Sequence, residues 1–210
     1  MNNKIYRAAN AYLTAKETVI ASRYFKEIIW QELVRFESVT ESYFLREAAW
    51  VILSSGMKET VVRGKFPAIS NAFLHWSSAA EIVAQAEICE SRAFESFRHK
   101  GKLNAILTIA HAVQEIGFEN LMRTIQCNGP ETLQRFPYLG PATSLHLAKN
   151  LGLGVAKPDR HLMRIAGKSG YNSPADLCND IASLVGEDIA VIDLVLWRYA
   201  TLHRNYLSIF

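Results

Sequence analysis

The sequence predicts an all-α protein, and three observations support that prediction. Apolar side chains recur every three to four residues along most of the chain, as they do on the buried face of a helix. Nowhere does an alternation of apolar and polar residues persist, as it would in a half-buried strand. Half of the 210 residues are hydrophobic (50%), so the chain can bury a sizeable core and is not expected to be disordered.

Helical patterns follow one another from Ile5 to His203. The stretch from Ile5 to Phe36 breaks near Thr18 and Ser22, which predicts two helices there instead of one. The Ser-x-x-Glu spacing at Ser78 predicts another helix start. Further helices are expected over residues 41–55, 61–76, 103–116, 118–125 and 188–203.

Two helical patterns flank a tight segment, Pro137-Tyr138-Leu139-Gly140-Pro141. A turn this short joins two helices as a compact hairpin. Gly140 can adopt backbone conformations that other residues avoid, and Pro141 suits the first helical position, where its missing N–H costs nothing. The hairpin should therefore present free backbone N–H groups at a helix N-terminus, which is a neutral site suited to a phosphate.

The hairpin and the later element Asp159-Arg160-His161-Leu162-Met163-Arg164 together resemble the helix-hairpin-helix DNA glycosylases. This superfamily includes endonuclease III and the alkylbase glycosylases. Its pattern is a Leu-Pro-Gly-apolar-Gly hairpin, a helix beginning near Thr-Ala, and an Asp-x-His-x-x-Arg element. Here Phe136-Pro137-Tyr138-Leu139-Gly140 and Thr143-Ser144 fill the first two positions, with Tyr138 in place of the first glycine. The resemblance covers roughly residues 48–168.

The resemblance implies a two-lobed all-α fold with a cleft between the lobes. The first lobe is expected to be a helical barrel over residues 46–158, with the hairpin at 137–141. The second is expected to combine both ends of the chain, residues 1–45 and 159–210. Asp159 would then lie at the mouth between the lobes.

The implied activity is base excision, in which an altered base leaves the duplex and its N-glycosidic bond is hydrolysed. The transition state has oxocarbenium character, and a nearby carboxylate stabilises it. Asp159 matches the family's carboxylate. The residues alone also predict that Asp159 caps a helix, because Pro158-Asp159 directly precedes a helical pattern. The two roles are compatible, since a helix N-terminus keeps a carboxylate ionised.

Family members with lyase activity carry a lysine two residues after the second hairpin glycine, and this chain has Ala142 there. Alanine cannot form a Schiff base with the sugar. We therefore expect a monofunctional DNA glycosylase that leaves an abasic site. A bifunctional glycosylase/lyase and a non-catalytic DNA-binding protein are the alternatives. Lys157, two residues before Asp159, is expected to contact a phosphate or face solvent, and a displaced lyase amine is the alternative.

Double-stranded DNA is the expected partner, bound by a monomer. Phe97, flanked by Arg98 and Lys100, suits a wedge that enters the duplex while its neighbours hold phosphates, although such a cluster is also typical of a solvated loop. The resemblance also makes Met57, after the Gly56 corner, a candidate to fill the space of an extruded base. A glycine helix cap with a packed methionine is the alternative. The full set of expected DNA contacts is Tyr138, Leu139, Gly140, Pro141, Ala142, Thr143, Phe97, Arg98, His99, Lys100, Lys102, Met57 and Lys157.

The base pocket is expected to draw on scattered aromatic residues, and the excised base is not identified by the sequence. Asp193 is unusual because the rest of the run Val191–Trp197 is apolar. A carboxylate there must find a partner or face a cleft, so structural pairing and base reading are both open. The pocket candidates are Trp30, Tyr43, Trp50, Asp193 and Trp197.

The composition limits which partners, cofactors and locations are expected. A net charge of +3 is compatible with a polyanionic partner without demanding one. Cys89, Cys127 and Cys178 are isolated, which argues against a disulfide framework, a zinc site and the iron–sulfur cluster of some family members. No cofactor is expected, apart from a monovalent cation that the resemblance would place at hairpin carbonyls near Leu139. No apolar stretch reaches membrane-spanning length, so a cytosolic, DNA-associated protein is expected.

Overall fold

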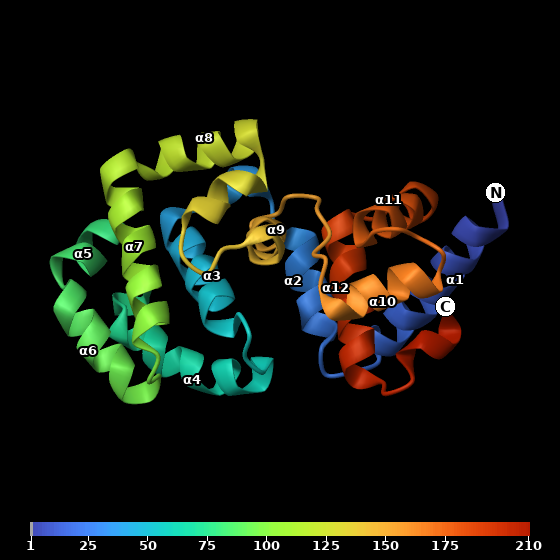
Figure 1. Ribbon diagram of the computed structural model, residues 1–210, viewed down its shortest axis with the longest axis horizontal. Helices are drawn as coiled ribbons and strands as arrows, with labels where there is room; N and C mark the ends of the chain where they lie inside the picture. The colour runs from blue at the N-terminus through green and yellow to red at the C-terminus, as the bar shows by residue number, and fades with distance from the viewer. Residues whose placement is uncertain (1) are drawn as a thin grey trace. The chain divides into compact units, whose positions relative to one another are not determined.

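The computed structural model describes residues 2–210, and these residues form helices and connecting segments without any β-strand (Figure 1). The all-α prediction is therefore confirmed. The chain divides into two compact units. The terminal unit combines the residues up to Phe36 with Ala148–Phe210, and the middle unit is Glu37–Leu147. Both divisions fall earlier in the chain than the expected lobe boundaries at residues 45/46 and 158/159.

The terminal unit is built around α12 (Ile189–Leu202), which is apolar on almost every side, as expected for a helix buried on all faces. It packs against α1, α2, α10 and α11, and Figure 1 shows these helices around it. The predicted break near Ser22 is confirmed, because α1 ends at Ile20 and the chain turns before α2. The surrounding helices are α1 (Asn2–Ile20), α2 (Phe25–Leu33), α10 (Arg160–Lys168), α11 (Pro174–Val185) and the 3₁₀ helix η4 (Tyr206–Ile209).

Two contacts tie the early and late segments of the terminal unit together. Arg198 of α12 donates from Nε and Nη2 to the two carboxylate oxygens of Glu27 in α2, each at 2.8 Å. Gly152 approaches the backbone of Phe36 so closely that a Cβ would lie 2.8 Å from Phe36 N. Its φ of +90° is also a conformation that other residues avoid, so only glycine fits here.

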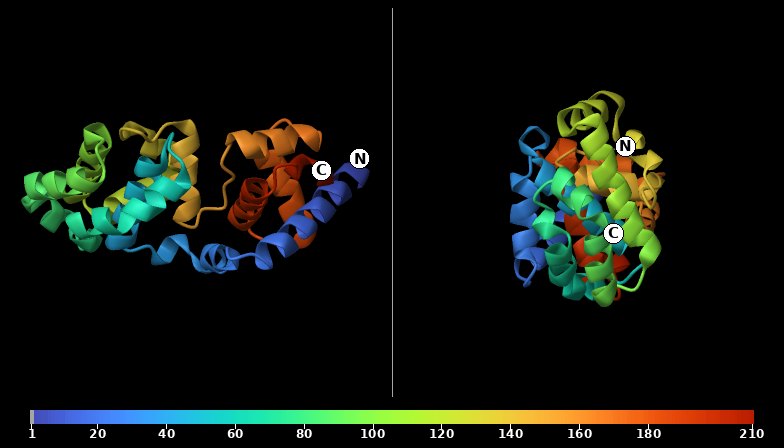
Figure 2. Two further views of the ribbon diagram at one scale, coloured as in Figure 1. Left: turned by 90° about the horizontal axis from the view of Figure 1, so that it is seen from below. Right: turned by 90° about the vertical axis from the view of Figure 1, so that its left-hand side faces the viewer.

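The middle unit is built around α7 (Lys100–Ile116), which packs against α3, α5, α6 and α8. Figure 2 shows this unit from two further sides. The amphipathic pattern predicted over residues 103–116 becomes the buried face of this helix. The other helices are η1 (Phe36–Ser38), α3 (Glu41–Ser54), α4 (Glu59–Ala72), η2 (Leu74–Trp76), α5 (Ala79–Ala84), α6 (Ala86–Ser96), α8 (Phe118–Asn128), η3 (Pro130–Arg135) and the first part of α9 (Pro141–Asn150), which ends in the terminal unit.

The predicted helix start at Ser78 is confirmed, with one difference. Ser78 Oγ accepts a hydrogen bond from Glu81 N at 3.2 Å and caps α5. The Glu81 carboxylate does not reach back to the cap, because Oε2 instead accepts from the Ser77 hydroxyl at 2.6 Å. None of the helices described in residues 2–210 is long and apolar enough to cross a lipid bilayer.

Candidate functional site

The predicted hairpin forms a tight turn before α9, and its hydrogen bonds leave the first turn of that helix open. Ser144 N donates to Gly140 O at 2.8 Å, which is the first helical bond. The Thr143 hydroxyl donates to Tyr138 O at 2.8 Å and closes the turn. Within residues 2–210, the N–H groups of Gly140, Ala142 and Thr143 make no hydrogen bond. These groups remain available to an anion, as the sequence predicted.

Tyr138 occupies the place of the family's first hairpin glycine and adopts the left-handed backbone conformation, with φ at +65°. Its ring meets His99 edge-on, with centroids 5.9 Å apart. Lys102 Nζ lies 5.7 Å from the Tyr138 ring centroid. At Gly101, a Cβ would come within 2.7 Å of Tyr138 Oη. The start of α9 therefore lies beside the start of α7, so two helix N-termini come together in the middle unit.

Two of the expected DNA contacts are buried, which corrects their assignment. Phe97 is 2% exposed and packs over His99 with ring centroids 6.3 Å apart, so its side chain is core and not a surface wedge. Lys102 is 3% exposed and donates from Nζ to Leu53 O (2.7 Å) and Ser55 O (2.5 Å). It satisfies carbonyls at the C-terminal end of α3, where a cation is favoured. Burial lowers the pKa of Lys102.

Most of the remaining candidates of the middle unit have exposed side chains, whereas Ala142 and Thr143 are half-buried and Leu139 is buried. Arg98, His99 and Lys100 are exposed at the start of α7. Met57 is exposed after the corner where α3 ends. The Leu139 side chain is buried, so that residue can offer only its backbone to a ligand. The exposed set still combines basic side chains with free helix N–H groups, which suits phosphates.

Asp159 caps α10, as the sequence predicted. Its Oδ1 accepts hydrogen bonds from His161 N (2.8 Å) and Leu162 N (2.9 Å). Within the described chain, Oδ2 of the same carboxylate accepts no hydrogen bond. The cap therefore fixes the direction of the side chain while one oxygen stays available for chemistry. His161 packs its ring against Tyr206, with centroids 5.4 Å apart, which makes it a structural residue.

A buried ion pair holds the segment that leads to Asp159. The Lys149 ammonium at the end of α9 pairs with Asp193 Oδ1 in α12, and the two residues are 5% and 1% exposed. Asp193 Oδ2 accepts a hydrogen bond from Lys157 N at 2.7 Å. Asp193 thus uses both oxygens structurally, which corrects its candidacy for base reading. Burial raises the pKa of the Asp193 carboxyl, and the Lys149 ammonium acts against that rise.

Lys149 is the important residue that the sequence reasoning missed. The unusual Asp193 signalled that a partner was needed, but the pattern of α9 did not show which lysine pointed inward. The ammonium of Lys157 lies in the same electrostatic environment. Burial lowers its pKa, repulsion from Lys149 lowers it further, and Asp159 and Asp193 oppose both effects.

The aromatic pocket candidates divide between the units. Trp30 and Trp197 belong to the terminal unit, where the Arg198 guanidinium lies 4.6 Å from the Trp197 ring centroid. Tyr43 and Trp50 belong to the middle unit, and Trp50 meets Phe66 edge-on with centroids 5.2 Å apart. All four side chains are half-buried. Among residues 2–210, no cluster of His, Cys, Asp or Glu side chains is arranged to hold a metal ion.

No protein-family model and no curated protein matches this sequence. Among solved structures, the chain is similar to the 8-oxoguanine glycosylase/lyase of Methanocaldococcus jannaschii, crystallised with 15mer DNA containing 8-oxoguanine. The TM-score is 0.56 at 18% sequence identity, and the match covers 90% of this chain and 97% of that chain. The chain therefore shares the all-α fold of that glycosylase/lyase. The fold predicted by the hairpin and the Asp159 element is thereby confirmed.

The packing of Tyr138 on Gly101 predicts the effect of adding one methyl group. Alanine normally stabilises a helix by up to about 1 kcal/mol relative to glycine, and Gly64→Ala in α4 should show this gain because its Cβ meets nothing within 4 Å. Gly101→Ala should show none, because Tyr138 Oη must move. Adding Tyr138→Phe should restore stability in the Gly101→Ala background. Thermal unfolding of these three variants and the wild type measures this. If Tyr138→Phe does not raise the stability of Gly101→Ala, the packing is contradicted.

The buried pair predicts a pH-dependent loss of stability in Lys149→Met. Removing one member of a buried ion pair typically costs about 3–5 kcal/mol. Without Lys149, the pKa of Asp193 should rise further. A carboxyl whose pKa is higher in the folded state contributes stability that is lost as pH rises through that pKa. The free energy of unfolding that Lys149→Met loses relative to the wild type should therefore be larger at pH 8 than at pH 5. Denaturant unfolding at the two pH values measures this. The double variant with Asp193→Asn should lose less than the sum of the single variants, and additivity would argue against the coupling.

Proposed function

We propose that the protein is a monofunctional DNA glycosylase that hydrolyses the N-glycosidic bond of an altered base in double-stranded DNA and leaves an abasic site. The observation that carries the proposal is Asp159, whose carboxylate has one oxygen fixed by the α10 cap and one available, in a chain with a glycosylase fold. A carboxylate fixed in this way is pre-oriented before substrate arrives.

The chemistry requires one carboxylate and one water. As the bond between C1′ and the base nitrogen lengthens, the sugar becomes cationic and Asp159 Oδ2 stabilises that charge. The base leaves with the bonding electrons. The water that attacks C1′ gives up a proton, which Asp159 can accept as a general base. The backbone N–H groups of His161 and Leu162 hold the carboxylate in its orientation until then.

DNA binding is assigned to the start of α9 and the start of α7 in the middle unit. The free N–H groups of Gly140, Ala142 and Thr143 suit a phosphate, and Arg98 and Lys100 add positive charge nearby. These contacts would hold the DNA backbone of any sequence. We propose a monomer for this role. A monovalent cation bound by hairpin carbonyls belongs to the same proposal.

A bifunctional glycosylase/lyase is the second candidate, because Lys157 has the lowered pKa that a nucleophilic amine needs. Its amine would add to C1′ of the opened sugar, release water and form a Schiff base. Elimination would then break the bond between C3′ and its oxygen. Ala142 at the family's lysine position is the reason to place this candidate second.

Asp159→Asn should abolish base release and preserve DNA binding. Asparagine can still cap α10, so the fold should survive. The lost negative charge is commonly worth on the order of 3 kcal/mol, a hundredfold or more in rate. The measurement is single-turnover release from duplexes that each carry one modified base, with a gel-shift assay beside it. Asp188→Asn is the matched control, since Asp188 caps α12 in the same manner. Near-normal release by folded Asp159→Asn would refute the assignment.

The product strand should remain unbroken until it is treated with alkali or amine. Ala142 cannot form a Schiff base, so borohydride should trap no protein–DNA adduct. Denaturing electrophoresis of reactions before and after alkali tests this directly. Strand cleavage at the rate of base release, lost in Lys157→Ala, would instead assign the amine role to Lys157 and favour the second candidate.

A further inference from the structure

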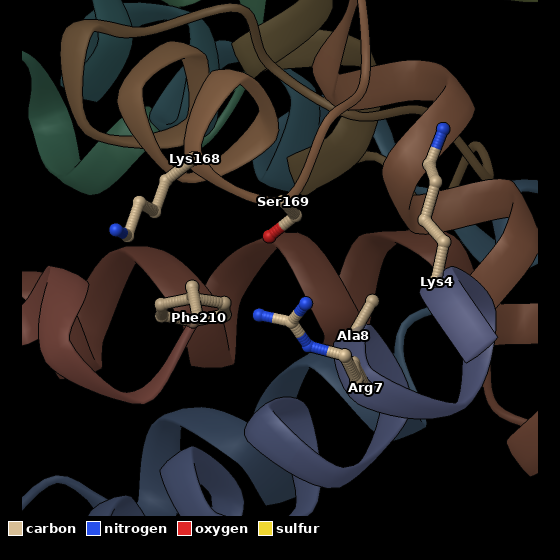
Figure 3. A pocket seen from close by; sticks show the side chains of 6 residues that line it. All are labelled: Lys4, Arg7, Ala8, Lys168, Ser169 and Phe210. Atoms are coloured by element: carbon tan, nitrogen blue, oxygen red, sulfur yellow. The ribbon is translucent and has the colours of Figure 1, made fainter.

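A small pocket of the terminal unit lies away from the residues discussed so far, between the start of α1 and the end of α10. Its volume is about 70 Å³, and it is lined by Lys4, Arg7, Ala8, Lys168, Ser169 and Phe210. Figure 3 shows Arg7 and Ser169 pointing into the same space, with Lys168 and Phe210 beside them. Asp159 is at the opposite end of α10, roughly 13 Å along the helix axis for nine residues. The pocket is therefore distinct from the catalytic candidate.

The charged side chains that line this pocket are all basic. Within residues 2–210, neither Arg7 nor Lys168 forms an ion pair. Lys4 at the rim places its ammonium 3.5 Å from the Tyr171 ring centroid, also without a carboxylate. Figure 3 shows the Arg7 guanidinium beside Ser169, while the Lys168 and Lys4 side chains extend from the rim in other directions. No acidic side chain lines the pocket. Such a site attracts an anionic ligand.

The position of Lys4 is unfavourable for the helix that carries it. Lys4 lies in the first turn of α1, at the positive end of the helix dipole, and that turn contains no acidic residue. A cation is disfavoured there. A bound anion would reverse that cost, because it would be attracted both by the helix end and by the side chains.

Ser169 supplies an independent observation. Its Oγ is buried and has no hydrogen-bond partner within the described chain. A buried polar atom without a partner loses its hydrogen bonds to water and gains none in return, so such atoms are uncommon in folded proteins. Because Figure 3 shows this hydroxyl directed toward the Arg7 guanidinium, a ligand oxygen held by Arg7 could accept a hydrogen bond from it.

We propose that this pocket binds a phosphate group. A guanidinium can donate two parallel hydrogen bonds to phosphate oxygens, an ammonium adds a point charge, and a hydroxyl donates to a third oxygen. The group belongs either to a DNA backbone or to free inorganic phosphate, which share this chemistry. The proposal does not depend on glycosylase activity, because inorganic phosphate alone is its first probe.

The main test compares two double variants with the same change in charge. Arg7→Gln/Lys168→Gln removes the pocket cations. Lys26→Gln/Arg204→Gln removes two exposed cations elsewhere in the terminal unit. Sodium phosphate should raise the unfolding temperature of the wild type and the control above the effect of sodium chloride at equal ionic strength. The pocket variant should bind phosphate about tenfold more weakly or worse. Equal responses of the two double variants would overturn the proposal.

Ser169→Ala provides a second test that leaves every charge in place. Phosphate binding should weaken roughly fivefold, the effect of one lost hydrogen bond. Stability without phosphate should be unchanged or higher, since an unsatisfied hydroxyl is removed. A loss of stability without phosphate, together with an unchanged phosphate response, would overturn the role given to Ser169.

A DNA titration distinguishes the two sources of the phosphate group. The affinity for an unmodified duplex is measured over a range of salt concentrations. The quantity compared is the slope of log affinity against log salt concentration. A slope that is shallower by about 1 in the pocket variant than in the control indicates one lost contact with a backbone phosphate. If the two variants have equal slopes and the pocket variant has lost its response to inorganic phosphate, the free ion is the ligand.

Discussion

The buried pair of Lys149 and Asp193 is the interaction on which the geometry around Asp159 depends. A charge in the core is costly unless a partner and hydrogen bonds compensate it. Asp193 meets that requirement with two contacts, one to the Lys149 ammonium and one to the backbone N–H of Lys157. The end of α9, the middle of α12 and the loop before α10 are thereby held together. The position of the cap at Asp159 follows from this arrangement, because only one residue separates it from Lys157.

A second buried lysine has a comparable role in the middle unit with a different partner. Lys102 reaches the carbonyls of Leu53 and Ser55, so the end of α3 and the start of α7 are joined without a carboxylate. Carbonyls at a helix C-terminus carry partial negative charge, which makes them suitable partners for an ammonium. In both units, therefore, an internal cation positions a segment that leads to a candidate site. The exposed cations around that segment remain available to a ligand.

The sequence predicted what depends on neighbouring residues along the chain. Helical periodicity located the helices, the Gly140-Pro141 turn located the hairpin, and Pro158-Asp159 located the cap. What it missed depends on packing between distant segments. Lys149 and Asp193 are 44 positions apart, and Lys102 and Leu53 are 49 apart. Periodicity cannot tell an inward-facing lysine from an exposed one.

The missed burial of Phe97 has the same origin, because the contacts of α6 and α7 with their neighbours decide which way that ring points. The boundaries of the two units also depend on such contacts. Gly152 can approach Phe36 only once the chain has folded back on itself. No local pattern around either residue indicates that approach.

Tyr138 makes the hairpin conditional on its surroundings. A glycine would adopt the left-handed conformation by itself, whereas a tyrosine there costs roughly 1–2 kcal/mol of backbone strain. The contacts of its ring with His99 and Lys102 offset that cost, and they come from α7. An excised peptide of the hairpin and α9 would therefore be expected to relax into other turn conformations. For the same reason, this hairpin is a poor module for grafting: transplanted alone into another scaffold, it would leave behind the helix that holds it closed.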